Sequence, residues 1–337
     1  MPVSLRQQSR IGAYLLAQKL RRREHFPLIV QLEPLFACNL SCAGCGKRQH
    51  PAEVQRQLMP VETALAAVEE CGTPMVSIAG GEPLLHPELD RLVRALLRRK
   101  VFVYLCTNGL LLEERLDRFE PSPYFSWVVH VDGLREEHDA SVRREGVFDT
   151  AIRAIAAAKA AGFSVMTNTT VYARQPVESL RAGLDLLNDE IHVDAMMLAP
   201  AFAHEAAGDS EDFLSAGHAR ELFRDLFADG RRKHWRINHS PLFLDLLEGR
   251  ADYDCTTWAI PCYSVLGWQR PCYLRADGYL PTYRELVETT DWSRYGHASG
   301  DPACRECLGH SGFEPTAVLL TMRSPRHALR ALLETAR

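Results

Sequence analysis

The 337-residue chain has no apolar run near the roughly 20 residues that a helix needs to cross a bilayer. Its first 24 residues carry polar and charged side chains throughout, so we expect no secretory signal peptide. The formal net charge is only −4, which gives no global attraction to nucleic acid, and no nucleic-acid partner is predicted. Together these absences favour a cytoplasmic protein, which could still lie on the inner face of the cytoplasmic membrane.

Cysteine is too sparse for a disulfide scaffold, since ten cysteines are spread over 337 residues. The cysteines are nevertheless clustered, and clustering favours metal binding in a reducing compartment. A hydrophobic fraction of 46% and a charged fraction of 24% are typical of a globular protein. The length suffices for a large α/β domain with a smaller one beside it.

Apolar, β-branched stretches alternate with stretches of helical period between residues 27 and 200. Repeated βα units of this length form parallel sheets with right-handed crossovers. The predicted fold class is therefore α/β, a partial (β/α)6 parallel barrel with a smaller cysteine-containing C-terminal extension. The predicted strands are 27–34, 74–80, 101–106, 125–132, 163–171 and 194–200, and the helices between them are 59–71, 87–99, 110–119, 147–161 and 177–187.

Composition changes after Pro200, where a helix is predicted over 211–231 and a soft domain boundary near residue 232. The predicted domains are an N-terminal amphipathic helix at 1–26, a core at 27–232 and a C-terminal domain at 233–337. The N-terminal helix is basic, and it could pack on its own domain or lie on an anionic membrane surface. The basic helical stretch at 317–336 contains Pro325, which predicts either a kink or two short helices.

Three cysteines follow the first predicted strand at C-x3-C-x2-C spacing, namely Cys38, Cys42 and Cys45. Four-cysteine zinc and iron–sulfur sites take all their ligands from protein. Three thiolates on one loop can instead hold three irons of a cubane and leave the fourth iron open. A zinc knuckle would need His50 as its fourth ligand, and unconnected buried thiols are a further possibility.

The spacing resembles the signature of the radical S-adenosylmethionine (SAM) superfamily. The resemblance implies a [4Fe-4S] cluster on Cys38, Cys42 and Cys45, with SAM chelating the open iron. One-electron cleavage of SAM then releases a 5′-deoxyadenosyl radical. Gly44 departs from the pattern, because a bulky residue usually precedes the third cysteine.

The second predicted strand ends in Gly80-Gly81-Glu82-Pro83. Two glycines let the backbone approach a ligand closely. In radical SAM enzymes such a tetrapeptide holds the SAM amino group, so the resemblance assigns that role to Gly80, Gly81, Glu82 and Pro83. An ordinary β-turn is the alternative.

Polar side chains end the next three predicted strands. The carboxyl ends of parallel strands meet at one rim, where chemistry gathers in such folds. These side chains could bind the ribose hydroxyls and carboxylate of SAM, or they could simply cap strand ends. They are Asn108, His130, Asp132 and Asn168.

Cys106 lies at the end of the third predicted strand and points either into the barrel or into the helix layer. A free cysteine is usually a small buried hydrophobe. The functional alternative is a hydrogen-atom donor, since an S–H bond is weaker than a C–H bond and a thiol can quench a carbon radical.

The C-terminal extension holds a second group of cysteines, including the C-x2-C pair Cys304 and Cys307. With Cys255 and Cys272 this pair could form a four-thiolate site for an auxiliary iron–sulfur cluster or zinc. Structural thiols without metal are the alternative. Ser311 stands where the family discussed next leads us to expect a further cysteine.

Seven segments resemble the hopanoid-biosynthesis radical SAM family, the adenosylhopane synthases. The resemblance implies addition of the 5′-deoxyadenosyl radical to the terminal alkene of diploptene, with Cys106 as hydrogen donor and reduced flavodoxin or ferredoxin as electron donor. A paralogue acting on another lipid or small molecule, or a non-catalytic iron–sulfur or zinc scaffold, is the alternative. The segments are 33–47, 77–86, 102–108, 129–135, 240–245, 267–274 and 312–318.

Overall fold

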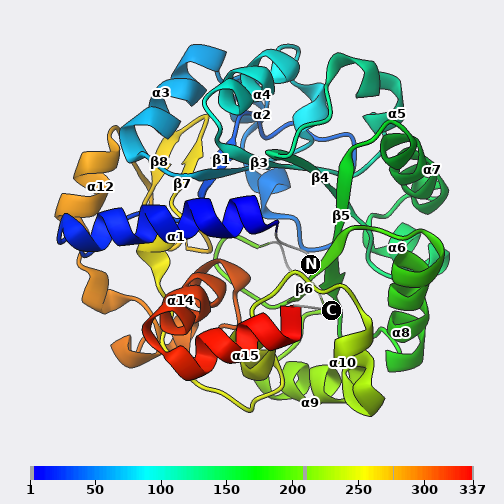
Figure 1. Cartoon of the computed structure of the whole chain (residues 1–337). Helices are drawn as coiled ribbons and strands as arrows, with labels where there is room; N and C mark the ends of the chain where they lie inside the picture. The colour runs from blue at the N-terminus through cyan, green and yellow to red at the C-terminus, as the bar shows by residue number, and fades with distance from the viewer. Residues whose placement is uncertain (1–3, 208–210, 276, 336–337) are drawn as a thin grey trace.

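The computed structural model describes residues 4–207, 211–275 and 277–335 (Figure 1). Each predicted domain, 1–26, 27–232 and 233–337, includes a few residues outside these ranges. The predicted domain boundaries stay predictions, because the C-terminal segment shares a sheet with the rest of the chain.

The centre of the molecule is a curved sheet whose first six strands are all parallel to their neighbours. Every strand predicted between residues 27 and 200 is present, and the predicted α/β partial barrel is confirmed. Apolar, β-branched sequence suits these strands because helices cover their outer face. The strands are β1 (Val30–Glu33), β2 (Met75–Ile78), β3 (Phe102–Thr107), β4 (Phe125–His130), β5 (Ser164–Val171) and β6 (Ala195–Pro200).

Helices connect these strands and pack on the outside of the sheet, as Figure 1 shows. The predicted helix at 110–119 is shorter, because it divides into one α-helical turn and a 3-10 turn at Leu116–Arg118. The sequence analysis missed α6 after β4. The helices of this part are α2 (Ala52–Gln55), α3 (Val61–Cys71), α4 (Leu89–Arg98), α5 (Leu112–Arg115), α6 (Arg135–Ser141), α7 (Val147–Ala160) and α8 (Val177–Asp185).

Alternate residues of each strand face the barrel interior, because side chains switch face at every position. Outward residues such as Val103, Leu105 and Trp127 join the core beneath the helices. Inward residues form a separate cluster. One inward layer, paired in register, runs through Cys106, Val128, Met166 and Ala195, and the next layer toward the carboxyl ends contains His130, Asn168 and Met197.

The C-terminal segment extends this sheet, which the sequence analysis did not predict. Strand β7 (Cys262–Ser264) pairs in parallel with β1, and β8 (Gly267–Gln269) and β9 (Tyr279–Leu280) follow antiparallel. Backbone bonds from Met196 to Arg236 and from Asn238 to Met196 cover the opposite edge, at β6. Both edges of the barrel sheet are therefore closed by residues beyond 232.

Two predicted helices of this region are divided. The predicted helix at 211–231 is α9 (Ala216–Leu226) and α10 (Arg231–His234), separated at Asp229 and Gly230, both with positive φ. The stretch around Pro325 forms two helices, α14 (His310–Arg323) and α15 (Pro325–Thr335). The remaining helices are α11 (Pro241–Leu247), α12 (Tyr283–Thr289) and α13 (Pro302–Arg305).

Helix α1 (Leu5–Leu20) packs on its own chain, alongside α14 in Figure 1. Gln7 is buried, and its Nε2 donates to Tyr104 Oη at 2.8 Å inside the barrel. Leu15 is buried against Leu28, whereas Leu20 is 75% exposed. Among the described helices none combines the length and hydropathy required to traverse a bilayer.

Candidate functional site

The loop after β1 carries Cys38, Cys42 and Cys45, all half-buried and free of disulfides. The Leu40 N–H points at Cys38 Sγ at 3.4 Å. Gly44 has φ of +67°, a left-handed conformation that favours glycine over the bulky residue expected there. The departure at Gly44 thus follows from the backbone of this loop.

The three thiols affect one another electrostatically. Burial, then the charges of Cys45 and Cys38, raise the pKa of Cys42 to about 12. Burial also raises the pKa of Cys38. Three thiolates can therefore coexist here only with compensating positive charge, which a metal cluster supplies.

The arrangement does not suit a zinc knuckle. Zinc with Zn–S bonds near 2.3 Å brings its ligand atoms within about 4 Å of one another. Within the described ranges, no group that includes these cysteines gathers three ligand atoms within 4.8 Å. His50 stacks on Phe36, with ring centroids 4.4 Å apart.

Gly80 and Gly81 lie where the end of β2 crosses the base of the cysteine loop. A Cβ on Gly80 would lie 2.4 Å from Leu35 O, and one on Gly81 would lie 2.0 Å from Ala37 O. The Gly81 N–H donates to Leu35 O at 3.0 Å. The glycines therefore let the two strand ends meet, which is a structural reason for them independent of SAM.

Glu82 is buried, and its carboxylate is used within the chain. It accepts hydrogen bonds from Leu84 N at 3.0 Å, Thr107 Oγ1 at 2.9 Å and Asn108 N at 2.8 Å. Burial raises the pKa of Glu82, although these hydrogen bonds act to lower it. Glu82 thus ties β2 to β3.

Asn108 links the end of β3 to the cysteine loop, since its Nδ2 donates to Asn39 Oδ1 at 2.7 Å. Asn39 was missed by the sequence analysis, although it lies directly after Cys38. The amide of Asn108 therefore both caps its own turn, through Leu110 N, and orients the loop.

Asp132 orients His130 at the end of β4. Its Oδ2 accepts from His130 Nε2 and from Ser141 Oγ, each at 2.7 Å, and its Oδ1 accepts from Thr170 N at 2.8 Å. Burial opposes ionisation of Asp132, but the neighbouring His130 brings its pKa below the usual value. Asn168 lies beside His130 in register on β5.

Cys106 points into the barrel rather than into the helix layer. Its Sγ lies 3.7 Å from Ser77 Oγ, and it packs with Val128 and Met166. The thiol lies two residues before Asn108, so it is about 7 Å deeper than the rim. Burial raises the pKa of Cys106 to about 11, which keeps its S–H proton at neutral pH.

The four C-terminal cysteines lie close together, although the first and the last of them, Cys255 and Cys307, are 52 positions apart in the sequence. These two cysteines, together with Cys272 and Cys304, line one cavity of about 80 Å³. The N–H groups of Leu274 and Gly309 point at the sulfurs of Cys272 and Cys307 at 3.4 and 3.2 Å. Burial and the other thiolates raise the pKa of Cys255.

Segment 202–207 joins the two cysteine groups. Phe202 and His204 line the C-terminal cavity, and the Ala206 N–H donates to Leu274 O at 3.0 Å. The Ala206 carbonyl lies where a Cβ on Gly46 would be, 1.5 Å away. The sequence analysis did not identify this segment.

Comparisons with known proteins match both halves of the chain. The radical SAM superfamily matches residues 32–187, and a domain of unknown function, DUF3463, matches residues 196–331. Residues 32–187 form a radical SAM domain. This domain type uses a [4Fe-4S] cluster and SAM, and the donor set of three half-buried thiols on one loop fits that cluster.

Curated relatives share the radical SAM domain. The mycofactocin maturase MftC of Mycobacterium tuberculosis is 31% identical over 171 residues, which are 49% of this chain and 43% of that protein. The GTP 3′,8-cyclase of Chlorobaculum tepidum is 29% identical over 206 residues, covering 59% of this chain and 62% of that one. The chain thus spans less than two thirds of either relative.

Solved structures share the fold of the radical SAM domain. Streptococcus suis SuiB bound to S-adenosylmethionine has a TM-score of 0.60 at 17% identity, covering 75% of this chain and 62% of that one. The enzyme anSMEcpe with bound AdoMet has a TM-score of 0.60 at 18% identity, covering 83% and 86%. These similarities establish a common architecture.

Proposed function

We propose that this chain is a radical SAM adenosyl transferase that joins the 5′-deoxyadenosyl group of SAM to the terminal alkene carbon of diploptene, giving adenosylhopane. The observation that carries the proposal is the position of Cys106, a protonated thiol inside the barrel, one layer below the rim. A reaction that ends in a carbon radical needs a hydrogen-atom donor at such a place.

The residues at the rim have distinct tasks in this proposal. Cys38, Cys42 and Cys45 hold the cluster, which with SAM supplies a 5′-deoxyadenosyl radical when bound. Backbone groups of Gly80–Pro83 accept from the SAM ammonium. Asn108, His130 and Asn168 face the nucleoside and carboxylate, and Asp132 fixes the ring of His130.

In the proposed reaction one electron from reduced flavodoxin or ferredoxin would break the C5′–S bond of SAM and release methionine and the 5′-deoxyadenosyl radical. The alkene π bond breaks, a carbon–carbon bond to the deoxyadenosyl C5′ forms, and a tertiary carbon radical remains on the triterpene. The S–H bond of Cys106 breaks and a C–H bond forms at that carbon. The resulting thiyl radical takes one electron from reduced flavodoxin or ferredoxin and one proton from solvent.

The layer around Cys106 favours a hydrocarbon substrate. The layer runs from Cys106 through Val128, Met166 and Ala195, and apart from the hydroxyl of Ser77 beside Cys106 the cluster is apolar, with Tyr104 and Met197 as further members. Such a wall suits a pentacyclic skeleton better than the triphosphate of a nucleotide. The names of the relatives, a peptide maturase and a GTP cyclase, define the rival substrate classes.

An anaerobic incubation of reconstituted protein with SAM, reductant and diploptene tests the function. We expect a product with the mass of diploptene plus adenosyl plus hydrogen. The Cys106→Ala variant should still cleave SAM but lose the saturated adduct, and Cys71→Ala, which changes a thiol in the helix layer, is the matched control. A full yield of the saturated adduct from Cys106→Ala would rule out Cys106 as the hydrogen-atom donor. Release of 5′-deoxyadenosine without an adduct would show that the substrate is another molecule.

We also propose that Cys255, Cys272, Cys304 and Cys307 hold a second iron–sulfur cluster. Their common cavity and the N–H groups directed at two of the sulfurs support it. Zinc fits less well, because in the described part of the chain no three of these sulfurs lie within 4.8 Å of one another. Cys304→Ser should lower the iron content by about half if both sites hold [4Fe-4S] clusters, and an unchanged iron content would reject the second cluster.

A further inference from the structure

A group of buried His239 and half-buried His310 and Glu314 lies outside both cysteine sites. His310 and Glu314 are one helical turn apart on α14, and His239 comes from the loop before α11. One ligand atom from each of the three lies within 4.8 Å of the others. Two histidines and a glutamate form a ligand set that proteins use for zinc.

Hydrogen bonds to the outer edge of β6 fix the orientation of His239. Its Nε2 lies 2.8 Å from Leu198 N and 2.9 Å from Leu198 O, so this nitrogen is committed to the strand. The side chain is fully buried, and among the described residues its Nδ1 has no hydrogen-bond partner. Nδ1 lies 3.7 Å from Glu314 Oε2, which directs the unpaired nitrogen into the group.

Neighbouring residues contact the other two members, Glu314 and His310. Ser240 donates to Glu314 through its N–H at 2.8 Å and through its hydroxyl at 3.4 Å. The ring of His310 lies 5.0 Å from that of His239 and 5.6 Å from that of Phe243. A hydrogen bond from a neighbouring residue, such as that from Ser240 to Glu314, orients a metal ligand.

We propose that His239, His310 and Glu314 bind a divalent transition metal ion, zinc by ligand chemistry, through His239 Nδ1, a ring nitrogen of His310 and a carboxylate oxygen of Glu314. Zinc prefers four-coordinate sites, so one position remains for water. The ion would link α14 to the loop before α11 at the edge of β6. This site does not depend on the proposed reaction.

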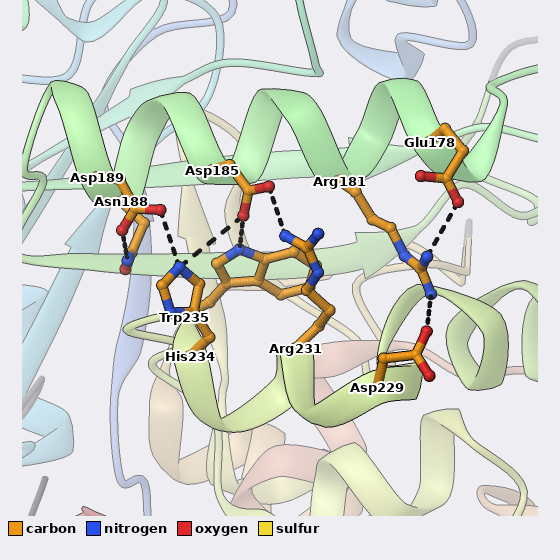
Figure 2. Close-up of polar contacts among 9 residues, drawn as sticks. All are labelled: Glu178, Arg181, Asp185, Asn188, Asp189, Asp229, Arg231, His234 and Trp235. Atoms are coloured by element: carbon orange, nitrogen blue, oxygen red, sulfur yellow. Dashed lines mark hydrogen bonds and ion pairs between the residues drawn. The ribbon is translucent and has the colours of Figure 1, made fainter.

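A second group of three potential ligands, Asp185, Asp189 and His234, provides a contrast, shown in Figure 2. Asp185 accepts from Arg231 and from Trp235 Nε1, and Asp189 accepts from His234 and from Asn188. Its polar atoms thus have partners within the protein. That group joins α8 to α10 by hydrogen bonds and carries no metal proposal.

Cobalt(II) titration of protein with reconstituted iron–sulfur clusters tests the site. Filling the cysteine sites first prevents cobalt from binding there. We expect a single cobalt ion per chain with visible d–d bands and no thiolate charge-transfer band. His310→Ala and Glu314→Gln should each weaken cobalt binding about 100-fold or more, because even outer-shell changes cost 10–100-fold.

The matched control is Asp189→Asn in the exposed group of Figure 2, which should leave cobalt binding unchanged. Glu314→Gln can still accept from Ser240, so it answers the question even if His310→Ala does not fold. Equal cobalt affinity in the wild type and both variants, a thiolate-type spectrum, or no binding at all would overturn the proposal. None of these readouts requires turnover of diploptene.

Discussion

At the scale of single residues, Cys106 depends on the register of β3. A shift by one position would turn the thiol from the barrel interior to the helix layer, because side chains alternate along a strand. In the interior it packs among apolar side chains and away from any cation that would favour the thiolate. An ordinary cysteine has a pKa of about 8.5, whereas burial raises that of Cys106 to about 11.

This difference predicts a pH profile. Only the thiolate reacts with iodoacetamide, so alkylation of Cys106 should stay slow at pH 8.5 and rise with a midpoint near pH 11. Peptide-resolved mass spectrometry of the cluster-loaded protein measures this midpoint. The same peptide in urea-unfolded protein is the control and should show a midpoint near the usual value of about 8.5. An identical midpoint in the folded protein would contradict the buried position.

Single residues also show what sequence can predict. The cysteine spacing located Cys38, Cys42 and Cys45 on one loop, because a tight loop after a strand is set by local sequence. The partners of Glu82 were not predictable in the same way, since Thr107 and Asn108 lie 25 and 26 positions away. His239 and Glu314 are further apart still, and no periodic pattern connects them.

At the scale of elements, α8 and α10 are joined by the contacts of Figure 2. Helix α8 continues into a π-helical turn at Leu186–Glu190, which carries Asn188 and Asp189 toward α10. Asn188 Oδ1 accepts from Arg236 N at 3.0 Å. Residues 236–239 cover the edge of β6, so these contacts place the strand-capping segment as well as α10.

Two aspartates of this network should differ in their contribution to stability. Asp185→Ala leaves the N–H of the buried Trp235 indole unpaired, at a cost of about 1–3 kcal/mol in the free energy of unfolding. Asp189→Asn removes a charge from an exposed pair and should cost less. Urea denaturation of both variants measures the difference. Equal losses would mean that the indole hydrogen bond contributes nothing.

Elements also differ in how well the sequence predicts them. Strands β1 to β6 are apolar and β-branched, and the helices between them have one apolar face. Periodicity in the sequence therefore suffices to predict these elements. Strands β7 to β9 have only three, three and two residues and lie among glycines and prolines. Helix α14 begins at His310, earlier than predicted, and contains Pro315, which disfavours a helix unless packing supports it.

At the scale of the whole molecule, the exposed apolar side chains are concentrated on the terminal helices. Leu16 and Leu20 on α1, Met322 on α14 and Leu329 on α15 are each more than half exposed. Leu15 on α1 and Val318 on α14 belong to the same hydrophobic cluster. Basic residues lie on the same helices, with Lys19 on α1, Arg323 on α14 and Arg326 on α15. This surface would suit an anionic bilayer that holds the proposed triterpene substrate. Contact with a membrane surface is our proposal for it.

Sedimentation with phosphatidylserine vesicles tests membrane contact. Wild-type protein should co-sediment with these vesicles and less with neutral phosphatidylcholine vesicles, because part of the attraction is electrostatic. Leu16→Ser combined with Leu20→Ser should weaken binding several-fold without loss of folding, since both side chains are exposed. Leu58→Ser, at another exposed apolar residue, is the matched control. Equal binding by all three proteins would reject this surface.

The pairing of β7 with β1 also has a consequence for synthesis of the chain. Gln31 of β1 pairs with Ser77, which is made 46 positions later, and with Cys262, which is made 231 positions later. During translation the strand that leads into Cys38, Cys42 and Cys45 therefore waits with one side open. Contacts this distant in sequence slow folding. Iron delivered before residue 264 is made would meet a cysteine loop on an unfinished sheet, so we expect maturation of the metal centre to follow synthesis of β7.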